Sequence, residues 1–328
     1  MTQTIFVTGS AGFIGFHTCQ FLLKKGYTVI GVDNLNDYYD VRLKQKRLEQ
    51  LQAHDSYVHY TEDFCDFKVL KDIVLKHSPS KIIHLGAQAG VRYSLENPWE
   101  YERVNSLGTI SVLEVARQTG IEKVVLASSS SVYGGNTKVP FSERDSVERP
   151  VSVYAATKRH TELQAHVYHH LYGLSVICLR FFTVYGTYLR PDLALFKFVK
   201  KIVLDEEIQL YNDGDMKRDF TYVGDIVEGI IAALDSSQSY GIYNLGGDNP
   251  VSLKDLVLCI EETLGKKALI QYTKMQQGDV KETMADITRA KKDLAFCPKT
   301  PLPEIVKEFC VWFESDKEFL CSLEDAKQ

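Results

Sequence analysis

The chain has 328 residues, 45% hydrophobic and 25% charged, so it can bury a large core and is neither disordered nor a disulfide-rich miniprotein. Its formal net charge of -5 gives no general electrostatic reason to bind nucleic acid or an anionic membrane. The seven cysteines include no Cys-x-x-Cys pair, and no apolar run of about 18 residues occurs. We therefore expect a cytoplasmic protein without a metal site, a membrane partner or a nucleic-acid partner.

Short apolar runs alternate with longer amphipathic segments through the first half of the chain. The apolar runs are expected to form buried parallel strands at residues 5–8, 28–32, 81–85, 123–127 and 174–180. Helices are expected between the strands, at residues 13–25, 101–118 and 154–172. This alternation predicts a doubly wound α/β fold of the Rossmann type, with a mostly parallel sheet.

The pattern changes after about residue 180. Turns are expected at residues 211–214 and 246–250, and single helices at residues 224–234 and 252–264. These features predict a first, doubly wound domain over residues 1–180 and a smaller α/β lobe over residues 181–328, with a return to the first domain around residues 218–250. Ligands of open α/β sheets bind beyond the carboxyl ends of the strands, so we expect the site between the two lobes.

A glycine-rich turn follows the first expected strand and opens a helix. Its spacing is Gly-x-x-Gly-x-x-Gly, which permits a tight turn and lets backbone amides approach a pyrophosphate. The spacing alone is a weak signal, because such a turn can simply reverse the chain. The cofactor-binding candidates in this segment are Gly9, Gly12, Phe13, Ile14 and Gly15.

An acid at the end of the second strand strengthens the interpretation. Asp33 lies close to the ~20-residue offset at which a carboxylate binds the adenosine ribose, and its charge repels a ribose phosphate. The sequence therefore favours NAD over NADP. The other cofactor candidates, at this strand end and the following ones, are Asn34 beside the ribose, Asp63 and Phe64 near the adenine, and Leu85, Ala87 and Gln88 beneath the pyrophosphate.

A candidate catalytic group occupies the start of the helix at residues 154–172. Tyr154 and Lys158 are one turn apart and so lie on one helix face. A lysine cation and a positive nicotinamide ring are expected to lower the pKa of the phenol and make it a base. A serine run at residues 128–131 ends the fourth strand and offers a hydroxyl for the same proton transfer.

Together and in this order, these motifs resemble the extended short-chain dehydrogenase/reductase family of sugar-nucleotide epimerases and dehydratases. The resemblance implies that Tyr154 is the base and that Lys158 lowers its pKa and holds the nicotinamide ribose. It implies a catalytic hydroxyl at Ser129 or at Ser131, and both remain open. Asn105 matches the cofactor-side asparagine of the family. The helix pair at residues 101–118 and 154–172 matches the surface through which the family forms homodimers.

Positions that match the nucleotide-sugar site of the family lie mostly in the second half of the chain. Arg218 matches the arginine that binds the nucleotide diphosphate. Tyr211 matches a position near the uracil, and Asp279 lies in the region of the distal ribose or phosphate. The resemblance therefore implies a UDP-sugar substrate.

Three longer strings, at residues 88–98, 180–186 and 190–198, look like those of UDP-glucuronate 4-epimerases. A substrate carboxylate favours a planar charged donor, for which Arg190 and Arg92 are the candidates, with Thr183 beside them and Lys197 in the third string. Either arginine could instead contact the diphosphate or form a salt bridge between the lobes. The alternatives are a UDP-glucose or UDP-N-acetylglucosamine 4-epimerase, a UDP-glucuronate decarboxylase, and a noncatalytic NAD-binding protein.

Three histidines at helical spacing, His166, His169 and His170, are the one pattern that suggests a metal. No acid or cysteine cluster accompanies them, so a solvated helix face or a subunit contact is the preferred interpretation.

Overall fold

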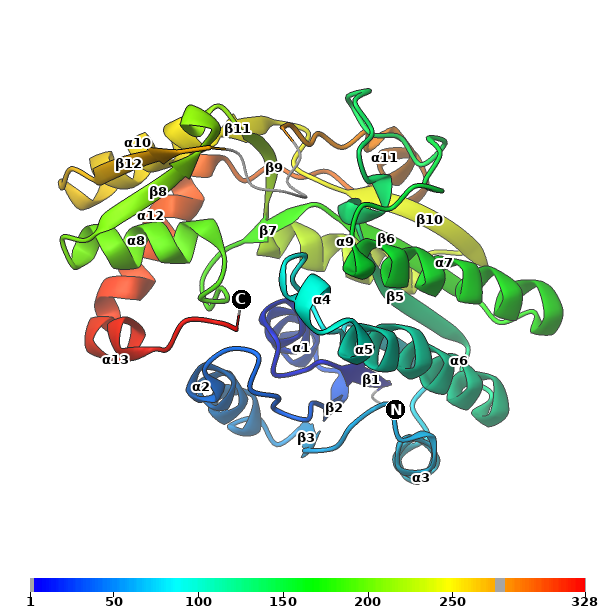
Figure 1. The fold of residues 1–328 in the computed structure, drawn as a ribbon. Helices are drawn as coiled ribbons and strands as arrows, with labels where there is room; N and C mark the ends of the chain where they lie inside the picture. The colour runs from blue at the N-terminus through cyan, green and yellow to red at the C-terminus, as the bar shows by residue number, and fades with distance from the viewer. Residues whose placement is uncertain (1–2, 275–280, 328) are drawn as a thin grey trace.

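The computed structural model describes residues 3–274 and 281–327 of the chain. Its main layer is a seven-stranded sheet, with strands in the order β10-β6-β5-β4-β1-β2-β3 (Figure 1). All six strand pairs are parallel. In chain order the strands are β1 (Thr4–Thr8), β2 (Thr28–Val32), β3 (Tyr57–Tyr60), β4 (Lys81–His84), β5 (Lys123–Ser129), β6 (Val176–Phe181) and β10 (Tyr240–Leu245).

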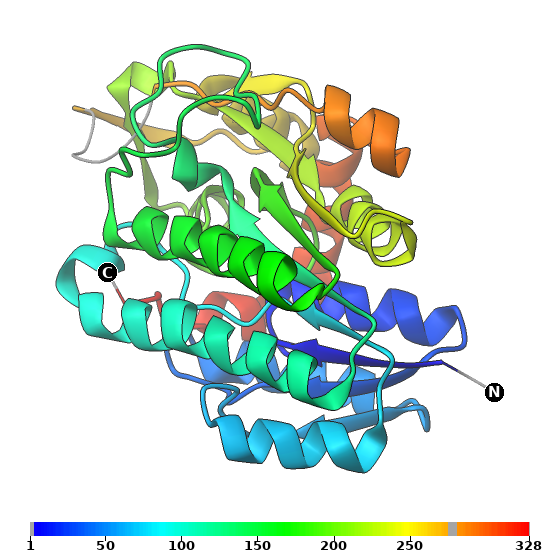
Figure 2. The same cartoon turned by 90° about the vertical axis from the view of Figure 1, so that its right-hand side faces the viewer.

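Helices cover both faces of this sheet, which makes the fold doubly wound as the sequence predicts. One face carries α3 (Phe67–His77), α6 (Gly108–Thr119) and α7 (Val153–Tyr172), which lie side by side in Figure 2. The opposite face carries α1 (Phe13–Lys24), α2 (Val41–Gln52) and α9 (Val223–Asp235). Each face buries its own cluster of apolar side chains, and every residue of β6 is buried. Burial on both faces explains why the strands are continuous apolar runs.

The remaining strands form two small sheets above the carboxyl edge of the main sheet. One has three strands, β7 (Thr183–Tyr185), β9 (Lys217–Tyr222) and β11 (Pro250–Ser252), and the other pairs β8 (Glu207–Tyr211) with β12 (Leu269–Thr273). The helices around them are α8 (Ala194–Val203), α10 (Leu253–Leu264), α11 (Thr288–Leu294), α12 (Leu302–Ser315) and α13 (Lys317–Ser322). The chain also forms two short 3-10 helices, η2 (Ser130–Tyr133) and η3 (Asn212–Gly214).

The predicted helix at residues 101–118 is helical throughout but is not one regular α-helix. After the short helices α4 (Tyr93–Glu96) and α5 (Pro98–Tyr101), the chain forms a π-helical segment, η1 (Glu102–Leu107), which runs directly into α6. A π-helical turn carries an extra residue and rotates the side chains that follow it, a geometry that periodicity does not reveal. The elements α2, α3 and β3 were also not predicted, whereas the predicted helices at 224–234 and 252–264 match α9 and α10 within a residue at each end.

The parallel register brings the ends of the strands together at one edge of the sheet. Thr8 of β1 pairs with Val32 of β2 and with His84 of β4, and Ser129 of β5 pairs with Phe181 of β6. The segments after these strands therefore line a single crevice, on either side of the point where the strand order reverses.

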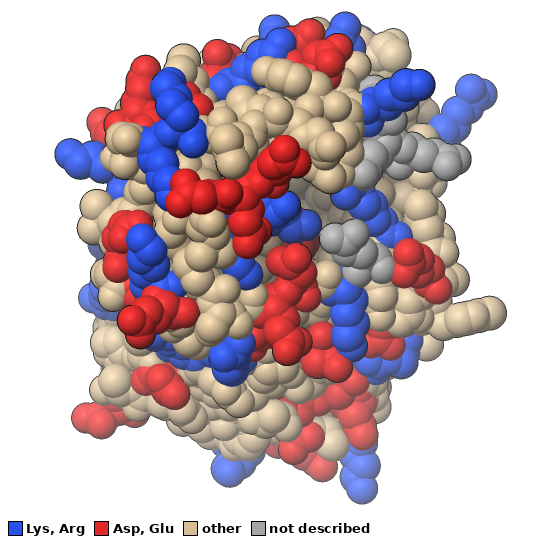
Figure 3. All heavy atoms as spheres, turned by 60° about the vertical axis from the view of Figure 1, so that its left-hand side comes forward, with Lys and Arg blue, Asp and Glu red and all other residues tan. Residues whose placement is uncertain are grey.

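Within the part of the chain that the structure describes, no helix is long and apolar enough to cross a membrane. On the face shown in Figure 3, Lys and Arg side chains are interspersed with Asp and Glu.

Candidate active site

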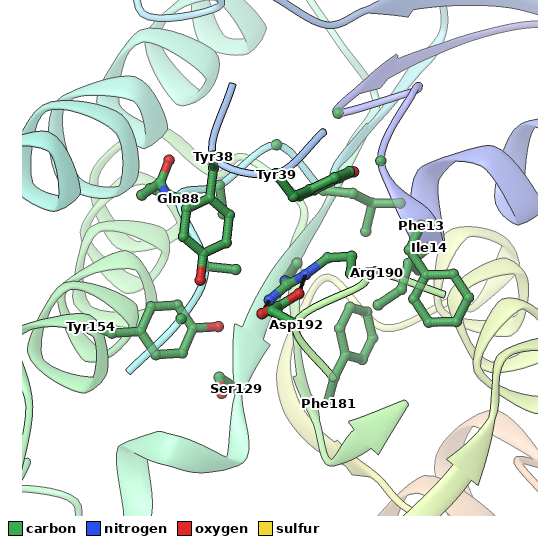
Figure 4. Close-up of a pocket in the computed structure, with 18 of the residues that line it drawn as sticks. Phe13, Ile14, Tyr38, Tyr39, Gln88, Ser129, Tyr154, Phe181, Arg190 and Asp192 are labelled. Atoms are coloured by element: carbon green, nitrogen blue, oxygen red, sulfur yellow. Dashed lines mark hydrogen bonds and ion pairs between the residues drawn. The ribbon is translucent and has the colours of Figure 1, made fainter. Parts of the chain in front are cut away.

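A cavity of about 550 Å³ lies beyond the carboxyl ends of β1, β4, β5 and β6. Most of the site residues predicted from the sequence line it (Figure 4). Those in its wall are Gly9, Gly12, Phe13, Ile14, Gly15, Asp33, Asn34, Phe64, Leu85, Ala87, Gln88, Arg92, Ser129, Ser131, Tyr154, Lys158, Thr183, Arg190 and Lys197.

The glycine-rich turn packs too tightly for side chains. A Cβ on Gly9 would lie 2.6 Å from the backbone nitrogen of Gly86, and one on Gly15 would lie 2.0 Å from the carbonyl oxygen of Gly9. Gly9 also has φ +70°, which favours glycine. Helix α1 begins at this turn without a side-chain cap, so its first N–H groups are available to an anion in the cavity.

Asp33 fixes the far side of the same turn. Its carboxylate accepts hydrogen bonds from the Ala11 N–H (3.1 Å) and the Leu35 N–H (2.9 Å). The side chain is buried in the cavity wall at the end of β2, where a bound ribose would meet it. The position is the one that the sequence predicts.

Two of the cofactor candidates lie outside the cavity wall. The Asn105 amide, on η1, accepts from the Gln88 N–H (2.9 Å) and donates to the Gln88 carbonyl and the Thr157 hydroxyl (3.0 Å each). Asn105 therefore holds the segment after β4 in place from behind. Asp63 pairs with Arg103 (2.7 Å) and likewise does not line the cavity. In both cases the local sequence does not reveal which way the side chain turns.

Tyr154 and Ser129 meet inside the cavity, Tyr154 from the first turn of α7 and Ser129 from the last residue of β5 (Figure 4). Burial raises the pKa of Tyr154, whereas a hydrogen bond with Ser129 and the charge of Arg190 act in the opposite direction. The Ser129 hydroxyl also accepts from the Ser131 N–H (3.1 Å). Of the two predicted serines, the geometry brings Ser129 to the phenol.

Lys158 is buried one turn after Tyr154 on α7. Its ammonium donates to the Ala127 carbonyl (2.8 Å), and burial lowers its pKa to about 8. The groups that oppose the raised pKa of Tyr154 are Ser129 and Arg190. The role expected of the lysine charge, which includes a contact with the nicotinamide ribose, stays a prediction. The carbonyl at the end of β5 holds the ammonium, and a sequence pattern cannot show that contact.

Arg190 is fixed at the other side of the cavity by a residue that the sequence reasoning missed. Its Nε and Nη2 donate to the two carboxylate oxygens of Asp192 (2.9 and 2.5 Å), and Nη1 carries two further N–H groups. Burial raises the pKa of Asp192, but the Arg190 charge outweighs it and the net pKa is lowered. The guanidinium lies over the Tyr38 ring at 5.8 Å from its centroid, and burial with the Asp192 charge raises the pKa of Tyr38 to about 12.

Asp192 could have been found from its spacing, because an acid two residues after an arginine is a natural partner. Tyr38 and Tyr39, which also line the cavity, lie in a loop without periodicity and gave no signal.

Two of the nucleotide-sugar candidates, Tyr211 and Arg218, lie outside the cavity wall. The Arg92 guanidinium lies over the Tyr211 ring (5.5 Å), and Tyr211 itself is outside the wall. Arg218 is also outside the wall and donates to the Lys217 carbonyl (2.9 Å). Asp279 lies outside the described residues. Of the histidines, His166 stacks on His170 and His169 stacks on Tyr240.

Comparison with known proteins places this geometry in a family. A family model described as GDP-mannose 4,6 dehydratase matches residues 6–309. The UDP-glucuronate 4-epimerase of Thermodesulfobacterium geofontis is 46% identical over 318 residues, which are 97% of this chain and 98% of the relative.

Two solved structures show the same architecture. The UDP-glucuronic acid 4-epimerase of Bacillus cereus, in complex with UDP-glucuronic acid and NAD, superposes with a TM-score of 0.90 at 32% identity, covering 95% of this chain and 99% of that chain. The UDP-glucose 4-epimerase of Thermotoga maritima, with UDP-glucose, gives a TM-score of 0.89 at 29% identity, covering 96% and 100%. The resemblance seen in the sequence is confirmed, and the chain belongs to the family of the GDP-mannose 4,6 dehydratase model, among the extended short-chain dehydrogenases/reductases.

Proposed function

We propose that the protein is an NAD-dependent UDP-sugar 4-epimerase that interconverts UDP-glucuronate and UDP-galacturonate. The observation that carries this proposal is a single cavity holding a half-buried phenol with its serine on one side and a half-buried guanidinium on the other (Figure 4). The first pair suits proton transfer at a sugar hydroxyl, and the guanidinium suits a carboxylate.

The residues present fit a dinucleotide. At Gly9 and Gly15 the turn packs so closely on backbone that no Cβ fits, and this tight turn places the uncapped N–H groups of α1 beside the cavity. Asp33 is placed for the adenosine ribose, and its negative charge favours NAD over NADP. Phe64, Leu85 and Ala87 form an apolar wall along the same path.

The reaction is a reversible oxidation and reduction at one carbon, with no net change in redox state. NAD, when bound, supplies the acceptor and donor of the hydride at carbon 4. Tyr154 takes the proton of the carbon-4 hydroxyl, and Ser129 shares that hydrogen bond and steadies the phenolate. Lys158 lies one turn along α7, and its ammonium, which here donates to the Ala127 carbonyl, would hold the nicotinamide ribose. The 4-keto sugar then turns over in the cavity, so that the hydride returns to the other face of carbon 4 while Tyr154 gives its proton back to the oxygen.

The substrate carboxylate must be held in one orientation as well as recognised. The 4-keto intermediate is a β-keto acid, which loses carbon dioxide when the breaking bond aligns with the ketone. A guanidinium locked by Asp192 holds a carboxylate in one plane, because both of its paired nitrogens are fixed. We assign Arg190 to this restraint, with Thr183 and Arg92 as neighbouring polar contacts of the sugar and the nucleotide. A decarboxylase would lack the restraint, and a neutral-sugar epimerase would not need it.

The direct experiment is to incubate the holoenzyme with UDP-glucuronate and follow the sugar protons by NMR. We expect UDP-galacturonate to appear until an equilibrium mixture forms, with no UDP-pentose. A UDP-pentose as main product would identify a decarboxylase, and no reaction with any UDP-sugar would leave a noncatalytic NAD-binding protein.

The choice of a uronic acid predicts the effect of removing the guanidinium. The double variant Arg190→Gln/Asp192→Asn removes both charges and leaves no unpaired carboxylate. We expect affinity for UDP-glucuronate to fall roughly ten- to a hundredfold, about 1.5–3 kcal/mol, while UDP-glucose and UDP change little. Asp192→Asn alone is the matched control, because it keeps the guanidinium. An equal loss for all three ligands, measured by calorimetry, would assign Arg190 to the diphosphate instead.

We also propose that the protein is a homodimer. Apolar side chains project from the outer surface of α7 and its neighbour α6 with η1, where Leu171 is 61% exposed and Leu107 is 59% exposed. Ile110, Leu163 and Val167 lie exposed on the same helix pair, which lies on the surface in Figure 2. Such a surface suits a second copy packed as a four-helix bundle.

Leu163→Glu/Leu171→Glu would place charges in this interface and is expected to give a monomer in light scattering. Leu258→Glu/Val311→Glu, on exposed apolar positions of α10 and α12, is the control that should stay dimeric. A parent protein that runs as a monomer at micromolar concentration contradicts the proposal.

We place the protein in the cytoplasm, because all seven cysteines are free thiols and a reducing compartment keeps thiols in that state.

A further inference from the structure

Arg47, on α2, is a fully buried arginine that the proposed reaction does not use. Its guanidinium donates to the Ala11 carbonyl (2.9 Å), the Tyr39 hydroxyl (2.7 Å) and the Tyr188 carbonyl (2.7 Å). Among the described residues, its Nε has no hydrogen-bond partner. These partners are two carbonyls and a phenol, so the hydrogen bonds do not neutralise the charge. Burying such a group is costly, and a neutral side chain would fill the same space.

The two carbonyls belong to the two halves of the active site. Ala11 lies inside the glycine-rich turn, and its N–H is held by Asp33. Tyr188 lies two residues before Arg190 and has φ +56°, a backbone conformation that a non-glycine residue adopts only at a cost. The planar fork of an arginine can donate in two directions at once, which a lysine ammonium on one flexible stem does less well.

Other contacts fasten the same loop to the cofactor side. The His17 ring, on α1, hydrogen-bonds the Thr187 carbonyl (2.8 Å), and the Gln50 amide on α2 donates to the Tyr188 hydroxyl. Of these three side chains, Arg47 is the one that hydrogen-bonds both this loop and the glycine-rich turn. The loop that delivers Arg190 is therefore built on the helices of the cofactor half.

We propose that Arg47 is a positioning residue that fixes Arg190 relative to the glycine-rich turn. It thereby couples recognition of the sugar carboxylate to the cofactor-binding half of the site. The proposal rests on the proposed function, in which Arg190 binds that carboxylate. Without the bridge the strained loop relaxes, and Arg190 shifts while its pairing with Asp192 persists. An Arg47 variant then loses discrimination between a uronic acid and a neutral sugar, while its fold stays intact.

The variants are Arg47→Met, which keeps the length and removes the fork, and Arg47→Lys, which keeps the charge. Arg42→Met is the matched control, because Arg42 is an exposed arginine on the same helix that pairs with Asp40. With NAD-loaded enzyme, the dissociation constants of UDP-glucuronate, UDP-glucose and UDP are measured by calorimetry. We expect both Arg47 variants to lower the preference for UDP-glucuronate over UDP-glucose roughly fivefold or more, a coupling of ordinary size. Affinity for UDP and cooperative urea unfolding should persist, and Arg42→Met should resemble the parent.

A double-mutant cycle identifies the route. If Arg47 acts through Arg190, Arg47→Met made in the Arg190→Gln/Asp192→Asn background should change the preference by less than about twofold. An unchanged preference in both single Arg47 variants, an additive loss in the combined variant, or failure of both single variants to unfold cooperatively would each overturn the inference. If Arg190→Gln/Asp192→Asn itself leaves the preference unchanged, the proposed carboxylate contact fails and the inference falls with it. If Arg190→Gln/Asp192→Asn removes the preference and the Arg47 variants do not, only the inference fails.

Discussion

The phenol of Tyr154 is subject to three influences that the structure separates. Burial raises its pKa, and the Ser129 hydrogen bond and the Arg190 charge lower it. A substrate carboxylate paired with Arg190 would cancel much of that last charge. The Ser129 hydroxyl is then the protein group in contact with the phenol that still favours the phenolate, and its contribution should be visible in the rate.

At this scale we predict a difference between two neighbouring serines. Ser129→Ala should lower kcat roughly 10- to 100-fold, the cost of about 1.5–3 kcal/mol for a hydrogen bond to a charged group. Ser131→Ala should cost less than about threefold, because only its backbone N–H contacts Ser129. Steady-state kinetics with UDP-glucuronate gives both values, and NAD titration checks that each variant still binds the cofactor. The reverse order of effects would move the catalytic hydroxyl to Ser131.

Helix α7 organises the catalytic face as one element. It begins after Ser152, whose hydroxyl accepts the Ala155 N–H (3.1 Å), and ends at Gly173 in the left-handed conformation. Glu162 lies two turns beyond Tyr154 on the same face. Its carboxylate accepts from the Ser128 hydroxyl (2.6 Å) and pairs with the buried Arg180 of β6 (2.8 Å). These contacts fix the helix against the ends of β5 and β6.

The junction of β1 with α1 is the second element that depends on close approach. Gly15→Ala would force a Cβ to within 2.0 Å of the Gly9 carbonyl oxygen, so the turn must open. We expect NAD affinity to fall at least about tenfold, or roughly 1.4 kcal/mol, with a stability loss of about 1–3 kcal/mol from overpacking.

Gly135→Ala is the control for this substitution, since its nearest neighbour to an added Cβ is a Val151 methyl at 3.8 Å. Fluorescence titration with NAD compares the two. Equal NAD affinity in parent and Gly15→Ala would mean that the turn does not carry the pyrophosphate.

At the scale of the whole molecule, folding keeps the buried His84 and the half-buried His17 in the neutral form. Burial lowers the pKa of His17 to about 4 and that of His84 to about 3, helped by nearby cations. The unfolded chain, with an ordinary histidine pKa near 6.5, binds more protons than the folded chain below that pH. The stability due to these histidines is therefore complete above about pH 6.5 and is lost as the pH falls toward 4.

Urea unfolding at pH 7 and pH 5 measures this effect. His17→Gln keeps an amide donor for the Thr187 carbonyl and removes the titration, so the fall in unfolding free energy between the two pH values should shrink by about 2 kcal/mol. Comparison with the parent cancels the carboxylates that titrate in the same range, such as Asp219, whose pKa burial raises to about 6. Identical pH dependence in both proteins would show that the pKa of His17 is the same in the folded and the unfolded chain.

Sequence reasoning succeeded where a feature is local. The glycine-rich turn, Asp33 at a strand end and the Tyr154–Lys158 spacing each occupy a few consecutive residues, and the structure brings them to one cavity. A local pattern could not show contacts between distant segments. Asn105, in the π-helical segment η1, accepts from the Gln88 N–H, and Lys158 donates to the Ala127 carbonyl of β5.

The late position of the edge strand β10 in the chain affects how the protein folds during its synthesis. It pairs with β6 in the main sheet, yet it follows β7, α8, β8 and β9 in the chain. When only the first 180 residues have left the ribosome, one edge of β6 is therefore unpaired. The backbone N–H and C=O groups along that edge can then pair with a strand of another chain. Completion waits until residue 245 has emerged, so the two lobes mature together during synthesis, and a gene split near residue 180 should yield an aggregating first half.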